Sequence, residues 1–467
     1  MDANGEPSTS ALESTPPPTT IQSGDHVLVR QPNGDVRSIK IERDSTIQIG
    51  RVGSFYANEL MGQQYGLTYD IVEKKLKVIP PRTLEEVEDT DATNELINDG
   101  EFVQPLTITE ITALKQSGVH ASDIIKKQIE QHANYSLKTE YSKEKYKKRK
   151  EAKYSKSFTT IDPTLFNVCD YWFNKDQNRV RDIRPDTLTQ MLLLANVQPG
   201  GRYIVVDDAS GIVVSGVLER LGGEGRLLTI CDTDSPPAYP VMANMNFKPN
   251  EVSSVLVSLN WATAQEEYNP IMAPSELAPE EIRSDRQKSR LKKRKLVSDA
   301  LHKTREELFA GEFDGLIIAS QYDPTSILAQ LAPYVAGSGS VVVHSPHLQV
   351  VSDLQTGLKS KPGFLAPTVT EVWLRRYQVL PGRTHPMMNT SGSGGYILHV
   401  IKVYGTYCDI RRILLLIHFL PRHDDQSATS VASHRQRPKK PKTQGTSENP
   451  SNSSTPAPAD AVTDAAT

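Results

Sequence analysis

The sequence predicts an α/β protein in which a doubly wound parallel sheet follows a small β-barrel and a basic helical linker. After residue 158, fully apolar strands alternate with helices, which is typical of a parallel sheet covered by helices on both faces. Before residue 80, short strands of alternating polarity are separated by turns that contain glycine, a pattern typical of a small barrel. A stretch rich in lysine, arginine and tyrosine lies between these two parts.

Changes in composition divide the 467-residue chain into five regions. We expect a disordered lead over residues 1–22, the β-barrel over 23–80, an acidic loop and helical basic linker over 81–157, the α/β domain over 158–400 with a basic insertion at 264–300, and a low-complexity tail over 401–467. Both ends are rich in serine, threonine and proline, which is typical of segments without a packed core.

The barrel is predicted from a series of short strands that begins after Asp25. Val27 and Val29 alternate with polar residues, and Asn33-Gly34 is a hairpin signal, because both central residues of a type I′ turn need positive φ. Further strands are expected at 36–41, 46–49, 69–72 and 76–79.

Two short helices are predicted after the acidic loop. Thr107 and Glu110 have the spacing of a capping box, in which each residue satisfies a backbone N–H of the other, so a helix begins there and ends near Gly118. A second helix begins near Ser122, and its isoleucines at positions 124, 125 and 129 share one face.

Whole-chain features exclude several classes of protein. The first 20 residues have no apolar core typical of a signal peptide, and the apolar run at 413–420 is far shorter than the roughly 20 residues that cross a bilayer. The three cysteines form no CxxC pair, which argues against a zinc ribbon or a disulfide framework. We therefore expect a soluble intracellular protein that has no membrane segment and binds no metal.

The α/β domain is predicted from five apolar strands at 203–206, 227–231, 255–259, 316–319 and 341–343. Helices are expected at 188–194, 213–221 and 327–331, between successive strands or before the first one. Two later strands at 372–379 and 396–400 are expected to pair with each other as an antiparallel edge.

The turn after the first strand is the usual place for a nucleotide or S-adenosylmethionine, and it needs glycines because the backbone must approach the ligand closely. Against the D-x-G-x-G-x-G pattern of methyltransferases, Asp207 and Gly211 fit, while Ala209 and Val213 replace the first and third glycines. The branched valine is stiff and fills space that a cofactor needs. Asp232 or Asp234, after the second strand, could still hold ribose hydroxyls. We expect no cofactor in this chain.

Three longer stretches together resemble a known family. Residues 138–154 read KTEYSKEKYKKRKEAKY, residues 184–192 read RPDTLTQML, and residues 371–386 read EVWLRRYQVLPGRTHP, followed by SGSGGYIL at 391–398. In this order they resemble the non-catalytic subunit of the eukaryotic tRNA (adenine(58)-N(1))-methyltransferase, over about residues 24–400. After residue 398 the sequence departs from the family pattern, and we assign no role to it.

The resemblance implies an N-terminal β-barrel, a Rossmann-like methyltransferase fold that has degenerated, and a heterotetramer of two such subunits with two catalytic ones. It also implies a nuclear location and a role in maturing initiator methionine tRNA. Catalytic subunits of the family carry a D-L-P-like motif after the fourth strand, where this chain has Ala319. An alanine cannot take up or orient a proton. We therefore expect no catalytic residue here, and a partner subunit that binds S-adenosylmethionine.

Basic residues interleaved with tyrosines predict where the tRNA is held, because cationic groups neutralise phosphates and aromatic rings stack on unpaired bases. The helix start at Thr107 could also bind a phosphate through free backbone N–H groups. The alternatives are a solvated helix for 138–156, salt bridges for 175–184, and loop capping for Arg383. The predicted tRNA-binding residues are Thr107, Thr109, Lys143, Lys145, Tyr146, Lys147, Lys148, Arg149, Lys150, Lys153, Arg179, Arg181, Arg184, Arg375, Arg376, Arg383 and His385.

A second basic run, RSDRQKSRLKKRK at 283–295, lies in the insertion between strands. It predicts a nuclear localisation signal, and further RNA contact or a plain charged helix are the alternatives. For the whole chain, the alternatives to a scaffolding subunit are a stand-alone RNA methyltransferase and an RNA-binding protein associated with translation initiation. The substituted turn and Ala319 argue against the first, and the second has no need of a degenerate methyltransferase domain.

Overall fold

The computed structural model describes residues 20–80, 107–117, 119, 121–131, 135, 140–233, 237–268, 285–380, 383–389 and 392–403. Most of the predicted lead, acidic loop and tail lies outside these residues, as do Asp234 and the apolar run at 413–420. Among the described helices, none combines the length and the apolar character that spanning a membrane requires.

The N-terminal part contains an antiparallel five-stranded sheet with the order β2-β1-β7-β5-β6 and a separate hairpin of β3 and β4. Its core stacks Phe158 against Phe55 at 5.1 Å and against Tyr69 at 5.6 Å between ring centroids. The strands are β1 (His26–Arg30), β2 (Val36–Lys40), β3 (Thr46–Ile49), β4 (Gly53–Tyr56), β5 (Thr68–Val72), β6 (Lys75–Ile79) and β7 (Ser157–Ile161).

The N-terminal sheet differs from the prediction in two ways. In the described residues it has two free edges, β2 and β6, so a closed barrel is not confirmed. Its central strand β7 follows the helical region in sequence and pairs with both β1 and β5. The predicted boundary at residue 158 therefore cuts through a strand of this sheet. The sequence analysis missed β7 because its partners lie about 90 residues away along the chain.

The predicted hairpin of β1 and β2 is confirmed, but its turn has a different geometry. Gly34 has a φ of +93°, whereas Asn33 is not among the residues with positive φ, so the turn is not type I′. The Gly34 N–H donates to the Gln31 carbonyl at 2.9 Å, and the Gln31 N–H donates to Asp35 at 2.8 Å. The loop is thus longer than the two residues expected.

Three helices precede β7: α1 (Ile108–Gln116), α2 (Ala121–Glu130) and α3 (Glu140–Tyr154). The capping box of α1 is confirmed, since the Thr107 N–H donates to Glu110 Oε2 at 2.8 Å and the Glu110 N–H donates to Thr107 Oγ1 at 3.3 Å. Ile111, Ile124 and Ile125 are buried together, and Ile129 packs against them, as the shared helix face predicts.

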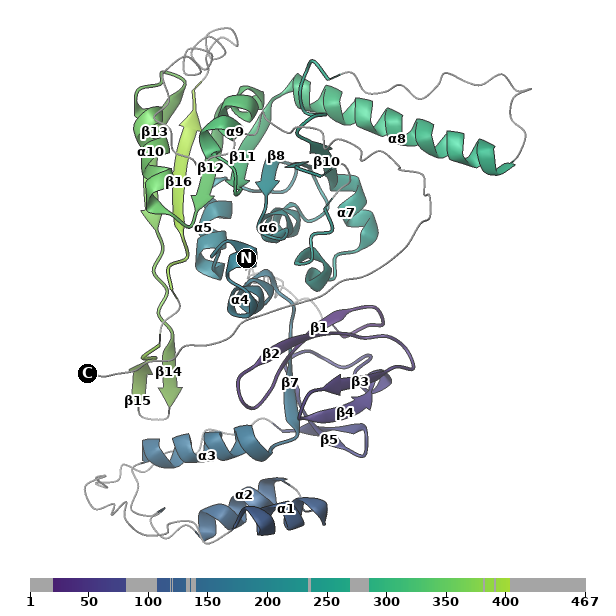
Figure 1. Cartoon of the computed structure of the whole chain (residues 1–467), viewed down its shortest axis with the longest axis vertical. Coiled ribbons are helices and arrows are strands. Elements are labelled where there is room, and N and C mark those ends of the chain that lie inside the picture. The colour runs from purple at the N-terminus through teal and green to yellow at the C-terminus, as the bar shows by residue number, and fades with distance from the viewer. Residues whose placement is uncertain are drawn as a thin grey trace, which may run out of the picture. The chain divides into compact units, whose positions relative to one another are not determined.

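The C-terminal part is built on a seven-stranded sheet with the order β10-β9-β8-β11-β12-β16-β13, which Figure 1 shows from β13 at the left to β10 at the right. The first five strands in this order are parallel, which confirms the predicted doubly wound sheet. The strands are β8 (Arg202–Asp207), β9 (Arg226–Cys231), β10 (Leu256–Asn260), β11 (Phe313–Ala319), β12 (Val335–Ser345), β13 (Phe364–Glu371) and β16 (Tyr396–Lys402).

Helices cover both faces of this sheet because its strands are apolar on both sides. Successive residues of β8 alternate between two cores: Tyr203 and Val205 pack in one, and Ile204 and Val206 in the other. The first core includes α4 (Leu165–Lys175), α5 (Pro185–Leu194) and α6 (Ile212–Leu221), and α7 (Pro249–Val255) packs there too. The second includes α8 (Asp285–Ala310), α9 (Pro324–Leu331) and α10 (Leu348–Lys359).

The predicted pairing of the two late strands is wrong. Strand β16 inserts between β12 and β13 and is antiparallel to both. The segment after β13 leaves the sheet and forms a small hairpin of β14 (Tyr377–Leu380) and β15 (Arg383–Pro386). An apolar strand such as β16 is buried most completely in the interior of a sheet, and sequence periodicity does not reveal which neighbours will bury it.

A short segment after β9 joins the two parts of the chain. It contains the 3₁₀ helix η4 (Met242–Met245), and the side-chain amides of Asn244 and Asn246 bond to the N-terminal sheet. Asn244 Nδ2 donates to Ser38 Oγ at 2.7 Å, and Asn246 Oδ1 accepts from the His26 N–H at 2.7 Å. Asn244 Oδ1 also accepts from the Trp172 indole at 2.8 Å.

Candidate functional sites

The turn between β8 and α6, at the point where the strand order reverses, is where a doubly wound sheet holds a nucleotide or S-adenosylmethionine. Here the carboxylate of Asp207 occupies the backbone donors of the turn. Its Oδ1 accepts from the N–H groups of Ala209 at 2.7 Å and Gly211 at 3.2 Å. Its Oδ2 accepts from Val213 at 2.8 Å and Val214 at 3.0 Å, at the start of α6.

Burial shifts the ionisation of Asp207 away from that of an exposed carboxyl group. Desolvation raises its pKa to about 6, although the backbone hydrogen bonds oppose this effect. The group is thus an internal cap of the turn, and the N–H groups of Ala209, Gly211, Val213 and Val214 all point to it.

The space beside the turn is filled by Tyr239, a residue that the sequence analysis missed. Gly211 has a φ of +84°, and a Cβ added to it would lie 2.6 Å from both Cβ and Cδ1 of Tyr239. Tyr239 is 4% exposed, and burial raises the pKa of its hydroxyl well above the ordinary range. Ala209 and Val213, the substituted glycines, are fully buried in the same core.

Two further carboxylates near the turn are held by side chains of the loop after β11. Asp208 Oδ2 accepts from the hydroxyl of Ser320 and from the Gln321 N–H at 3.0 Å. Asp232, the predicted ribose ligand, accepts from the Tyr322 hydroxyl at 3.1 Å. Ala319, in the place of the family's catalytic carboxylate, is buried at the end of β11.

The residues present do not fit S-adenosylmethionine. A cofactor in this turn needs open space beside the glycines and a free acid for its ribose. In this chain the ring of Tyr239 contacts Gly211, and Tyr322 binds Asp232. Sequence reasoning assigned the obstruction to Val213, whereas the structure adds Tyr239 from a different segment.

The predicted phosphate site at the start of α1 is already satisfied internally. Thr107 and Thr109 are exposed, and their hydroxyls bond to each other at 2.9 Å. The Glu110 carboxylate bonds to the backbone and hydroxyl of Thr107, and these bonds lower its pKa. An ionised glutamate at this end takes the place that a phosphate would need.

Helix α3 carries the predicted basic residues of the linker on several of its sides. Lys145, Arg149 and Lys153 are exposed, whereas Lys143, Lys147 and Lys150 are partly buried. The side chain of Lys148 lies outside the described part of the chain.

Tyr146 on α3 contacts other side chains of this region. Its ring meets that of Tyr135 edge-on at 5.9 Å, and the ammonium of Lys150 lies 5.0 Å from its centroid. This packing leaves less of the ring available for stacking on a base than the sequence predicts.

Helix α4 brings together basic residues that are far apart in the sequence. The guanidinium of Arg179 lies 5.9 Å from the Trp172 ring, and Lys175 lies 4.5 Å from the same ring. Arg376, from beyond β13, forms an ion pair with Asp170. Arg179 and Arg376 are exposed. The structure thus places two predicted RNA-binding arginines beside one helix.

Arg184 has a structural environment that does not fit the predicted contact with RNA. It is 2% exposed and makes a two-point ion pair with Asp186, at 2.9 and 2.7 Å. It also donates to the carbonyl oxygens of Gly392 at 2.6 Å and Val372 at 2.7 Å. Two of the family-like stretches, together with the glycine run that follows, therefore meet at this one side chain.

The remaining predicted residues have mixed environments. Arg181 is partly buried close to Asp207 and Asp208, and burial lowers its pKa. Arg375 is partly buried. His385 is exposed on β15, with Nδ1 2.7 Å from the Pro386 carbonyl oxygen. The side chain of Arg383 lies outside the described residues.

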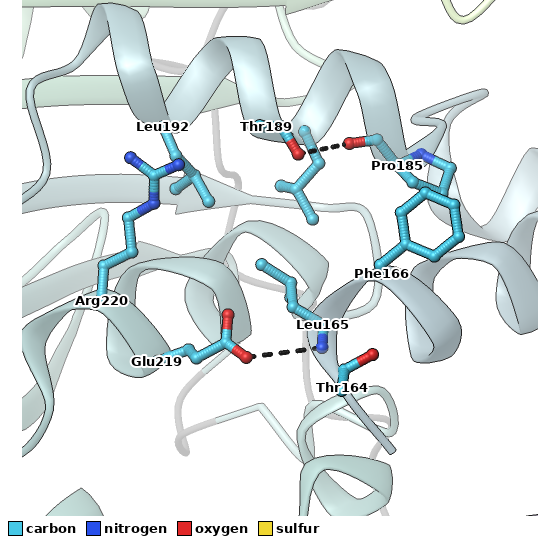
Figure 2. Close-up of a pocket in the computed structure, with 9 residues that line it drawn as sticks. Thr164, Leu165, Phe166, Pro185, Thr189, Leu192, Glu219 and Arg220 are labelled. Carbon is cyan, nitrogen blue, oxygen red and sulfur yellow. Dashed lines mark hydrogen bonds between the residues drawn. The ribbon is translucent and has the colours of Figure 1, made fainter. Parts of the chain in front are cut away.

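A small pocket of about 220 Å³ lies among α4, α5 and α6 (Figure 2). Two of its polar groups are bonded within the protein: the Leu165 N–H donates to Glu219 at 3.4 Å, and the Thr189 hydroxyl donates to the Pro185 carbonyl at 2.8 Å. None of the predicted site residues lines this pocket, and its volume is below the range of typical ligand sites, about 300–1,000 Å³. We assign it to helix packing.

Comparison with known proteins agrees with these features. The chain is 29% identical to the tRNA (adenine(58)-N(1))-methyltransferase non-catalytic subunit TRM6 of Debaryomyces hansenii, covering 86% of this chain and 91% of that protein. It is 28% identical to the protein of the same name from Schizosaccharomyces pombe (82% and 92% covered) and 27% identical to that from Mus musculus (84% and 91%).

Solved structures with similar chains include an S-adenosylmethionine-dependent O-methyltransferase from Thermotoga maritima, with a TM-score of 0.46 and 12% identity over 83% of this chain and 96% of that one. Another is the tRNA (m1A58) methyltransferase TrmI from Aquifex aeolicus, with a TM-score of 0.42 and 11% identity over 83% and 100%.

The decisive comparison is with a family profile that covers more than half of the chain. It matches residues 20–296, from the N-terminal sheet through the turn after β8 and into α8. The chain belongs to the Gcd10p family.

Proposed function

We propose that this chain is the non-catalytic, tRNA-binding and scaffolding subunit of a tRNA (adenine(58)-N(1))-methyltransferase. The observation that carries the proposal is a cofactor turn filled by the chain's own Tyr239 in a member of the Gcd10p family. The curated relatives are named non-catalytic subunits of this enzyme. In such a complex the partner subunit binds S-adenosylmethionine and performs the methyl transfer to N1 of adenine 58 in the T-loop.

The exposed cations support a role in holding tRNA. Lys145, Arg149 and Lys153 on α3, and Arg179 and Arg376 beside α4, have charged groups that can neutralise phosphates. Arg184 and the capped start of α1 are not part of this proposal, because their polar groups are bonded within the protein.

Methyl transfer by separated and combined subunits tests the proposal. We expect transfer to tRNA only when the chain and its catalytic partner are purified together, with neither active alone. Methyl transfer by this chain alone would instead support a stand-alone methyltransferase. Restoration of activity by an unrelated basic protein would contradict a specific scaffold.

Three finer features belong to the same proposal. We propose a heterotetramer of two such chains and two catalytic subunits, initiator methionine tRNA among the substrates, and a nuclear location. The basic run at 283–295 supports import into the nucleus. Native mass spectrometry of the complex tests the stoichiometry, methylation of individual purified tRNAs tests the substrate, and a fluorescent fusion tests the location.

A further inference from the structure

Helix α8 has two halves with different environments, and the C-terminal half is anchored. Leu308 is fully buried in the core of the α/β part. Arg305 is 8% exposed and donates to the carbonyl oxygens of Gln265 at 3.1 Å and Tyr268 at 3.0 Å, in the loop after β10. Glu307 accepts from Arg226 Nε on β9 at 2.9 Å. These contacts hold one end of the helix firmly.

The N-terminal half of α8 carries a basic run without a buried side chain. No residue from 285 to 300 is buried, and the segment Arg286–Lys295 contains no acidic residue. Its basic residues, all exposed, are Arg286, Lys288, Arg290, Lys292, Lys293, Arg294 and Lys295. Figure 1 shows both halves as one continuous helix, so the anchored half supports the basic run as an arm.

The charge pattern of this run disfavours the helix when no partner is bound. Arg286 and Arg290, Lys288 and Lys292, and Arg290 and Arg294 are each four residues apart, which places like charges next to each other on the helix surface. Phosphates bound along the run relieve this repulsion. Because the run extends over about 15 Å of helix, it can meet several phosphates of one backbone.

Resting on the proposed function, we propose that Arg286–Lys295 of α8 is an additional contact with the phosphate backbone of the bound tRNA. The contact is independent of RNA sequence because ammonium and guanidinium groups on all sides of a helix recognise charge and not bases. A protein partner is less favoured, since stable protein interfaces have an apolar centre and Leu291 is the one apolar residue within this run.

The test uses the complex of the full chain with its catalytic subunit and measures tRNA binding at several salt concentrations. One variant replaces Lys288, Arg290, Lys292 and Lys293 by glutamine, which keeps helix propensity and removes four charges. The matched control replaces four other exposed lysines by glutamine: Lys74, Lys75, Lys77 and Lys359. Circular dichroism and co-purification of the partner check that both variants fold.

For the α8 variant we expect an affinity at low salt about tenfold weaker than wild type, and a salt dependence shallower by roughly 1 to 3 phosphate equivalents. The control should stay within about twofold of wild type. Equal loss in both variants would reduce the effect to net charge and overturn the proposal. If wild type binds tRNA and the α8 variant matches it, the arm has no RNA role, while the proposed function stands. If wild type itself fails to bind tRNA, both proposals fall.

A location assay separates the two partners that a basic run can have. The same α8 variant, fused to a fluorescent protein, is compared with wild type in cells. Exclusion from the nucleus with unchanged tRNA affinity would identify the run as an import signal only, against our proposal. A photo-crosslinking residue at Leu296, which is 61% exposed, should attach to tRNA in the complex, and the same group at Val78, 46% exposed, should not.

Discussion

Tyr239 lies so close to Gly211 that a single added methyl group would be 2.6 Å from its Cβ and Cδ1 atoms. Gly211 is the one glycine of the predicted cofactor motif that this chain retains, and its left-handed φ still shapes the turn. The turn has therefore kept its backbone geometry while a tyrosine from the next loop fills the adjacent space. Five predictions follow from this arrangement and from the charged residues around it.

The purified chain should not bind S-adenosylmethionine. Tyr239 fills the space beside Gly211, and Asp232 is bonded to Tyr322, so neither the adenosine nor its ribose has a free site. Isothermal titration calorimetry should show no heat of binding with the chain alone and clear binding with the complex. Micromolar affinity of the chain alone would contradict the prediction.

Replacing Gly211 by alanine should destabilise the protein by roughly 2 to 4 kcal/mol, because the new Cβ adds a clash with Tyr239 to the strain of positive φ. The matched control is Gly34→Ala, at a φ of +93° with nothing within 4 Å of the added Cβ, which should cost only about 1 kcal/mol. Chemical denaturation of both variants measures the difference. Equal losses would show that Tyr239 contributes nothing.

Replacing Arg184 by lysine should lower stability by roughly 3 to 5 kcal/mol. Lysine cannot make the two-point ion pair with Asp186 and also reach the carbonyls of Gly392 and Val372, so buried groups lose their partner. Arg179→Lys is the control, since Arg179 is exposed and should change stability by less than about 0.5 kcal/mol. Thermal unfolding distinguishes them, and a stable Arg184 variant with weaker tRNA binding would favour RNA contact instead.

Asp207 should make stability fall as the pH rises from about 4 to 6. Its folded pKa of about 6 is above the unfolded value, so the folded state binds more protons in this window. The contribution is fully present below the unfolded pKa and is lost as pH rises through 6, by roughly 3 kcal/mol at most.

Comparing wild type with Asp207→Asn across this pH range isolates the group. The stability of wild type relative to the variant should decrease from pH 4 to pH 6 and then level off. A difference that stays constant with pH would mean that Asp207 titrates alike in both states.

Removing charge from α3 by replacing Lys145, Lys147, Lys148, Arg149 and Lys150 with alanine should weaken tRNA binding by the complex. Each lost phosphate contact releases fewer counterions, so the salt dependence should also become shallower by about one unit per contact. Filter binding at several salt concentrations measures both effects, and circular dichroism checks folding. If affinity and slope both match wild type, α3 is only a solvated helix.

The sequence by itself determined the doubly wound sheet, since each parallel strand is a continuous apolar run and each helix has local start and stop signals. The capping box of Thr107 and Glu110 is an example, because both partners lie within one turn of chain. The substitutions at Ala209, Val213 and Ala319 are likewise visible in the sequence, because a motif has fixed spacing.

Only the tertiary structure decided which distant segments meet. The pairing of β7 with β1 and β5, and the insertion of β16 between β12 and β13, join strands whose local patterns suit several neighbours. The same holds for Tyr239 beside Gly211 and for Arg184 between Asp186 and the Gly392 carbonyl. A lone tyrosine or arginine has no local pattern that separates a buried role from an exposed one. Its environment is set by the packing free energy of the whole fold, which no short stretch of sequence contains.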